Sequence, residues 1–167
     1  MIPGRNGVSA PYGFHRTSNW KAAPGWPDPK SPELDYAAIF LPEARIPPLP
    51  TDPALGDKLG YFGLEILDEK SNERLLVNNA GYPFEPRRPF GTLWYNAGRI
   101  NSFEKDFLTY LIDTQGGQSG SPVFVYREES RQRRVVAIHT TGYFPNRGIR
   151  ITQSVFDQLT DWAYNPP

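Results

Sequence analysis

The sequence lacks several features that would place it in other classes of protein. None of its 167 residues is a cysteine, which excludes a disulfide framework and thiolate chemistry. Its 18 basic residues balance its 18 acidic ones, so the sequence lacks the excess of positive charge that is typical of nucleic-acid-binding proteins. No apolar run approaches the roughly 20 residues of a membrane span, and the first residues do not have the pattern of a signal peptide. We therefore expect neither a nucleic acid nor a membrane as a partner.

Glycine, proline and aromatic residues are plentiful, and they separate short apolar segments. Because irregular turns lie between these segments, we expect an all-β protein, a sandwich or a barrel. The strand candidates are Ala37–Leu41, Leu75–Asn79, Thr92–Tyr95, Leu108–Ile112, Val123–Tyr126, Val135–His139 and Ile149–Ile151. Residues 1–32 resemble a loop. The end of the chain differs, because Thr152 can cap a helix whose apolar face begins at Val155.

The ten residues from Asp113 to Pro122 are the most informative part of the sequence. Two glycines there allow backbone angles that other residues resist, so that amide N–H groups can converge on one point. A serine nucleophile needs such donors for the oxyanion formed on attack, and the natural donors are the N–H groups of Gly117 and Ser119. The segment differs from the nucleophile elbow of α/β-hydrolases, because a strand and not a helix follows Ser119. The alternative is an ordinary Gly/Ser turn of a β-protein.

The run Asp-Thr-Gln-Gly-Gly-Gln-Ser-Gly-Ser-Pro-Val-Phe resembles the nucleophile segment of trypsin-like serine proteases, and in particular that of bacterial glutamyl endopeptidases. Further segments resemble the same family in the same order along the chain. They are Pro3–Gly7, Pro11–Gly13, Asp35–Ile39, Gly60–Gly63, Gly81–Pro83, Ile138–Thr140 and Asn146–Ile151. The resemblance implies a trypsin-like double β-barrel with an incomplete N-terminal barrel and a C-terminal α-helix.

The same resemblance implies a division of the chain. Residues 1–50 would form the remainder of the N-terminal barrel and the crossover, and residues 51–167 the C-terminal barrel with its helix. The proline-rich stretch 42–53 is the predicted crossover between the barrels. The family is mostly secreted, so the resemblance also implies a secreted protein.

A serine nucleophile needs a histidine to take its proton and a carboxylate to orient that histidine. Asp35 is our candidate for the carboxylate, because it precedes an apolar strand and matches the family's aspartate; the alternative is a loop aspartate at a strand start. The family's histidine belongs to a Thr-Ala-(Ala/Gly)-His segment that this chain does not contain. His15 is the only histidine before Asp35 and lies in a loop-like stretch. We therefore expect the first strands, and the base with them, to be missing from these 167 residues.

The resemblance also implies a specificity pocket. His139 would line it and bind a glutamate side chain, since an imidazole can donate to a carboxylate or pair with it. Thr114 would add a hydroxyl, and the backbone of Thr140, Thr141 and Gly142 would pair with an extended substrate. The alternative for His139 is a structural histidine at a strand end.

The sequence therefore predicts a serine endopeptidase that cleaves protein or peptide substrates after Glu or Asp through an acyl-enzyme. No cofactor is expected, and two histidines far apart in sequence make a poor metal site. Two alternatives stay open. One is an inactive homologue that binds extended peptides, and the other is a truncated, non-functional product with unpaired sheet edges.

Overall fold

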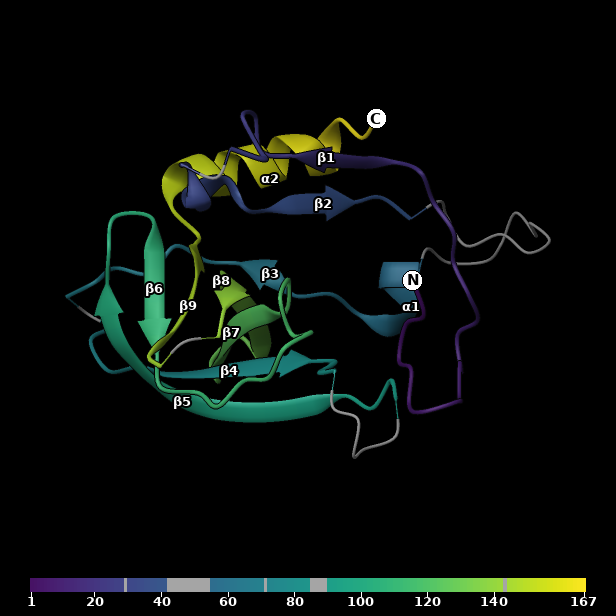
Figure 1. Cartoon of the computed structure of the whole chain (residues 1–167), viewed down its shortest axis with the longest axis horizontal. Helices are drawn as coiled ribbons and strands as arrows, with labels where there is room; N and C mark the ends of the chain where they lie inside the picture. Colours follow the sequence, from purple (N-terminus) through teal and green to yellow (C-terminus); the bar gives the residue numbers. More distant parts are fainter. Residues whose placement is uncertain (29, 42–54, 71, 85–89, 143) are drawn as a thin grey trace.

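The structure, a computed structural model, describes residues 1–28, 30–41, 55–70, 72–84, 90–142 and 144–167. Strands predominate in this part of the chain (Figure 1). The strands are β1 (Trp20–Ala22), β2 (Ala37–Ile39), β3 (Gly63–Leu64), β4 (Leu76–Gly81), β5 (Trp94–Phe103), β6 (Phe107–Tyr110), β7 (Pro122–Arg127), β8 (Gln132–Thr141) and β9 (Asn146–Arg150). The helices are the 3-10 turn η1 (Pro32–Leu34), α1 (Leu55–Leu59) and α2 (Gln153–Tyr164). None of the helices in the described ranges is long and apolar enough to cross a membrane.

The larger sheet closes into a barrel. Its strand order is β3-β8-β7-β4-β5-β6-β9, and β8 also pairs with β9, so six strands form a closed ring. β3 joins the outside of this ring, parallel to β8. Closure leaves few unpaired edges in the ring, and it fixes which side chains point inward.

Two groups of buried apolar side chains form the core. The first fills the barrel and includes Val77, Leu108 and Val123, all fully buried. The second lies where α2 and the β1–β2 sheet meet the end of β9, with Tyr36 and Trp162 as its aromatic members. The two-stranded sheet therefore lies against α2 and outside the barrel (Figure 1).

Most predicted elements are confirmed. The all-β class and the C-terminal helix are present, and the Thr152 hydroxyl accepts a hydrogen bond from the Val155 N–H at 3.3 Å, as expected of a helix cap. Residues 1–32 are not all loop, because they contain β1. β5 continues eight residues past the predicted end, to Phe103, since pairing with β4 and β6 holds its polar second half in place.

The predicted crossover at residues 42–53 lies outside the described residues. The division of the chain at residue 50 stays a prediction.

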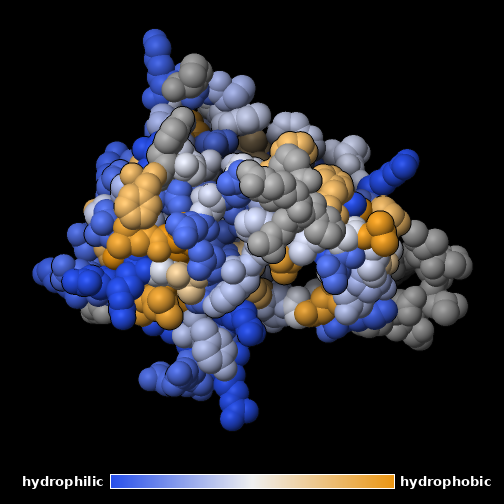
Figure 2. Space-filling view, turned by 60° about the horizontal axis from the view of Figure 1, so that its bottom comes forward, coloured by the Kyte–Doolittle hydropathy of each residue, from blue (hydrophilic) through white to orange (hydrophobic). Residues whose placement is uncertain are grey.

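On the face shown in Figure 2, apolar residues occur in separate groups among hydrophilic ones and do not form one continuous patch.

Candidate active site

The Ser119 turn connects β6 to β7 at one end of the barrel. The Ser119 side chain is exposed, and its Oγ donates a hydrogen bond to the carbonyl of Thr140 at 3.3 Å. The neighbouring Gln118 is buried, and its Oε1 accepts from the Gln115 N–H at 2.7 Å. The Gly120 N–H donates to the His139 carbonyl at 2.7 Å. The hydroxyl is thus presented to solvent by a turn that Gly120 ties to β8, and the Gln118 Nε2 donates to the Asn79 Oδ1 of β4 at 3.5 Å.

Two amide N–H groups in this turn are free. Neither Gly117 nor Ser119 donates its N–H to any residue in the described ranges, whereas the alternating amides of Gln118 and Gly120 are both paired. Gly117 has φ +97°, a backbone angle that side-chain-bearing residues rarely adopt. A Cβ at this position would lie 2.7 Å from the backbone nitrogen of Phe84. The free amides are the two that the sequence predicts as oxyanion donors.

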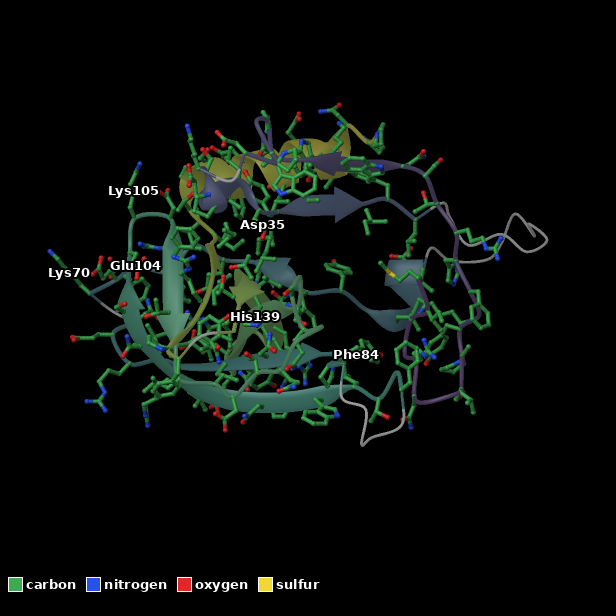
Figure 3. The ribbon with its side chains drawn as sticks, in the orientation of Figure 1. Asp35, Lys70, Phe84, Glu104, Lys105 and His139 are labelled. Atoms are coloured by element: carbon green, nitrogen blue, oxygen red, sulfur yellow. The ribbon has the colours of Figure 1, made fainter. Side chains whose placement is uncertain are left out.

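Asp35 lies between η1 and β2, in the layer above the barrel that contains His139 (Figure 3). Its side chain is exposed. Oδ1 accepts a hydrogen bond from the indole nitrogen of Trp26 at 3.2 Å. Within the described ranges the Asp35 carboxylate makes no hydrogen bond to a histidine or to Ser119.

Neither histidine is hydrogen-bonded to the Ser119 hydroxyl. The Nε2 of His15 lies 2.8 Å from the Tyr12 carbonyl in the N-terminal loop. His139 is buried in β8, and its Nδ1 lies 2.5 Å from the Tyr110 hydroxyl. Thus the structure joins Ser119 to the two free amides and to β8, but among the described residues it places no imidazole to take the Ser119 proton.

The environment of His139 favours a neutral imidazole. Burial lowers its pKa, because the charged form loses its hydration. Burial also raises the pKa of Tyr110, which therefore keeps its proton. If the Tyr110 O–H donates to Nδ1, the other ring nitrogen carries the imidazole proton. Nε2 has no hydrogen-bond partner in the described part of the chain, so in this tautomer its proton is available to a ligand.

A second polar group without a partner lies beside Gly142. The Thr114 hydroxyl is buried and has no hydrogen-bond partner in the described structure. It faces the backbone of Gly142, where an added Cβ would lie 3.4 Å from the hydroxyl oxygen. Gly142 is three residues after His139 in the chain. Buried polar groups are normally paired, so an unpaired hydroxyl can receive a bound polar group as its partner.

The end of β8 is open on the side of Ser119. β7 pairs with β8 as far as Ile138, opposite Pro122, whereas β9 continues to pair with β8 as far as Thr141. The last residues of β8, Thr140 and Thr141, therefore have a strand neighbour on one side only, and Gly142 follows them. An open strand edge can receive an extended peptide as an additional strand.

Two residues of this site were missed in the sequence. Tyr110 reads as an ordinary core residue of an apolar strand, and only the path of β6 beside β9, which in turn pairs with β8, brings it to His139. Gln118 reads as a variable position between glycine and serine. Its single signal is its place inside the Gly-Ser turn, and its burial follows from packing.

Two curated bacterial proteins are similar to almost the whole length of this chain. No family model matches the sequence. The glutamyl endopeptidase of Bacillus licheniformis is 38% identical over 172 residues, which cover 97% of this chain and 49% of that protein. A Bacillus subtilis protein named extracellular metalloprotease is 35% identical, covering 96% of this chain and 48% of that protein. The chain spans about half the length of these curated relatives. The described residues include no group of three or more His, Cys, Asp or Glu residues that could hold a metal ion.

Solved structures agree on the fold. A Glu endopeptidase in complex with MPD superposes with a TM-score of 0.75 at 22% identity, covering 97% of this chain and 69% of the other. The protease Anisep from Arthrobacter nicotinovorans gives a TM-score of 0.68 at 20% identity, covering 94% and 72%. The trypsin-like fold predicted from the sequence is therefore confirmed. The chain is a homologue of bacterial glutamyl endopeptidases and has the fold of the trypsin-like serine proteases.

Proposed function

We propose that this protein is a serine endopeptidase that hydrolyses peptide bonds after Glu or Asp. The observation that carries the proposal is the exposed Ser119 hydroxyl in a turn whose Gly117 and Ser119 amides are both free. Preorganised donors of this kind stabilise the developing oxyanion, and removing one of them typically lowers kcat about 10²–10³-fold. The relative named glutamyl endopeptidase supports the same chemistry.

The proposed reaction has two halves. The Ser119 oxygen leaves the Thr140 carbonyl and attacks the scissile carbonyl carbon, while a base takes the hydroxyl proton. The oxyanion binds to the N–H groups of Gly117 and Ser119, and on its collapse the C–N bond breaks as the base returns the proton to the leaving amine. Water then hydrolyses the acyl-enzyme by the same steps in reverse order.

The base in this proposal is a histidine outside these 167 residues, oriented by Asp35. Both histidines of the chain have other partners, since His15 lies against the Tyr12 carbonyl and His139 against the Tyr110 hydroxyl. The exposed carboxylate of Asp35, bonded only to Trp26 among the described residues, is accessible to an incoming imidazole.

The proposed preference for an acidic residue rests on His139 and Thr114. The Nε2–H of His139 and the Thr114 hydroxyl are both unpaired in the described structure, and both can donate to a carboxylate. Either Glu or Asp offers that carboxylate. The backbone from Thr140 to Gly142 would hold the residues before it as an added strand. Because the Bacillus subtilis relative is named an extracellular metalloprotease, we also propose that the protein acts outside the cell.

The test uses the protein as its native source makes it, after its intact mass and N-terminal sequence have been measured. The wild type and Ser119→Ala are treated with a serine-directed fluorophosphonate probe and with internally quenched peptides that contain one Glu. We expect labelling of Ser119 and cleavage after Glu, both lost in the variant. Equal hydrolysis by Ser119→Ala would refute the proposal. Circular dichroism of both proteins shows whether they are folded.

A second candidate is a non-catalytic homologue that binds extended peptides. The absence of an imidazole beside Ser119 among the described residues favours it. This candidate predicts binding of Glu-containing peptides without probe labelling and without cleavage. The endopeptidase predicts all three.

A further inference from the structure

An apolar cavity of about 400 Å³ adjoins the oxyanion turn. Tyr82, Phe84 and Phe90 supply much of its lining, and Gly117 forms part of its wall. Phe84 and Phe90 are 67% and 68% exposed, so two aromatic rings border the cavity with most of their surface uncovered. Single exposed apolar residues are common, but a hollow that is lined by them marks a place where an apolar group can bind.

The cavity is fixed to the turn through backbone contacts. The Phe84 N–H donates to the Gly116 carbonyl at 2.6 Å. Next to it, Gly117 approaches so closely that an added Cβ would lie 2.7 Å from the same nitrogen. Because these contacts join main chain to main chain, the distance from the cavity wall to the oxyanion amides does not depend on flexible side chains.

A second part of the cavity wall is formed by Arg5 and Phe90. The Arg5 guanidinium lies over the Phe90 ring, 4.6 Å from its centroid, and its Nε–H donates to the Gly7 carbonyl at 2.9 Å. The Tyr82 hydroxyl donates to the Arg5 carbonyl at 3.0 Å. Arg5 is the single charged residue in the described part of the lining, and the other lining residues are mainly aromatic and aliphatic, so the hollow is mostly apolar.

The cavity and the acid-binding groups lie in different directions from the nucleophile. The Thr140 carbonyl on β8 contacts the Ser119 hydroxyl, and His139 follows inside the barrel. The Phe84 backbone contacts the turn at Gly116 and Gly117, and Phe84 lies on the side of His139 that faces the N-terminal segment (Figure 3). The cavity is therefore available to the leaving half of a peptide whose acyl half lies along β8.

We propose that this cavity binds a large apolar side chain, such as Leu or Phe, from one of the first two residues after the scissile bond. The proposal rests on the endopeptidase function proposed above and adds a second specificity site to it. An extended chain advances about 3.3 Å per residue, and successive side chains point to opposite sides. Only one of these two positions can therefore enter the cavity, and selectivity should appear at that position alone.

The test measures binding separately from catalysis. Ser119→Ala protein is titrated with fluorescent peptides that share a Glu and carry Leu or Gly at each of the two following positions. We expect Leu at one position to bind roughly tenfold more tightly than Gly, the discrimination that an added apolar group typically gives in a pocket. Phe90→Ala, introduced into the same protein, should remove most of this difference.

Two further variants control for side effects. Phe84→Ala should act in the same direction, and Phe90 is the safer site because the Phe84 backbone contacts the oxyanion turn. Phe14→Ala removes an aromatic ring that is 66% exposed and does not line the cavity, so it should keep the preference for Leu. Equal affinity for Leu and Gly at both positions, or a preference that survives both cavity variants, overturns the inference.

Hydrolysis of the same peptides by the unmodified protein separates the two proposals. Cleavage after Glu without any preference for Leu supports the endopeptidase and overturns the cavity site. A cavity-dependent preference in binding without cleavage supports the site and refutes the endopeptidase, leaving a peptide-binding protein.

Discussion

The Ser119 turn and the Asp35 segment show how differently two parts of one proposed site are held. Ser119 lies between paired backbone groups, because Gln118 is buried and Gly120 is bonded to β8. Asp35 is exposed and has Trp26 as its hydrogen-bond partner in the described chain. The closed barrel therefore assembles the nucleophile, the free amides and His139 from a single sheet. The carboxylate comes from a separate layer, which packs on the barrel through the cluster that contains Tyr36 and Ile149.

Changing Asp35 tests the less constrained of these two regions and should have the largest effect. Asp35→Asn keeps the shape of the side chain but cannot stabilise an imidazolium, so we expect kcat to fall by up to about 10⁴-fold in the active full-length protein. The measurement is kcat for a Glu-containing peptide. Asp28→Asn is the matched control, because Asp28 is also exposed and its Oδ1 accepts a local hydrogen bond from the Lys30 N–H at 2.9 Å. Similar activities of both variants would place the catalytic carboxylate elsewhere.

Changing Gly117 tests the constrained region. Gly117→Ala places a Cβ against the Phe84 backbone and strains the left-handed φ, so the turn must shift and misplace an oxyanion donor. We expect kcat to fall about 10²–10³-fold with little change in KM. At Gly116 an added Cβ meets nothing within 4 Å, so Gly116→Ala should have a much smaller effect. Equal losses in both variants would mean that the turn tolerates no side chain at all, and the oxyanion role would lose its support.

Changing His139 separates specificity from catalysis. His139→Gln removes the proposed imidazole donor, so the kcat/KM ratio for Glu over Gln peptides should fall about tenfold or more, while cleavage of the Gln peptide changes less. The same ratio is measured for His15→Gln, which should retain it because His15 lies in the N-terminal loop. A comparable loss on all substrates would contradict a pocket role for His139.

The smallest expected effect concerns stability against pH. Burial lowers the pKa of His139 in the folded state below its usual value near 6.5, so between these two values the unfolded chain binds more protons. The free energy of unfolding should therefore be constant with respect to this group above about pH 6.5 and should decrease below it. Urea unfolding between pH 5 and pH 8 measures the slope, which His139→Gln should reduce. An unchanged slope in the variant would show that other groups cause the acid sensitivity.

Local patterns in the sequence were sufficient for the elements that depend on neighbouring residues. The Thr152 cap, the α2 apolar face and the strand after Ser119 follow from short-range rules, and all are present. β1 was missed because Trp20–Ala22 lies among prolines and glycines, and it becomes a strand only by pairing with β2. The second half of β5 is polar and was missed for the same reason, since its neighbours on both sides supply the pairing.

The sequence by itself determined the class of the fold, the nucleophile turn and its two glycines, because backbone angles and strand patterns are properties of nearby residues. Only the tertiary structure decided which groups are free to act. Barrel closure buries His139 against Tyr110, leaves the Thr114 hydroxyl without a partner, and brings residues 82–84 and 90 to the wall beside Gly117. Each of these contacts joins residues far apart in the chain, and whether a polar group is paired depends on packing that no local pattern records.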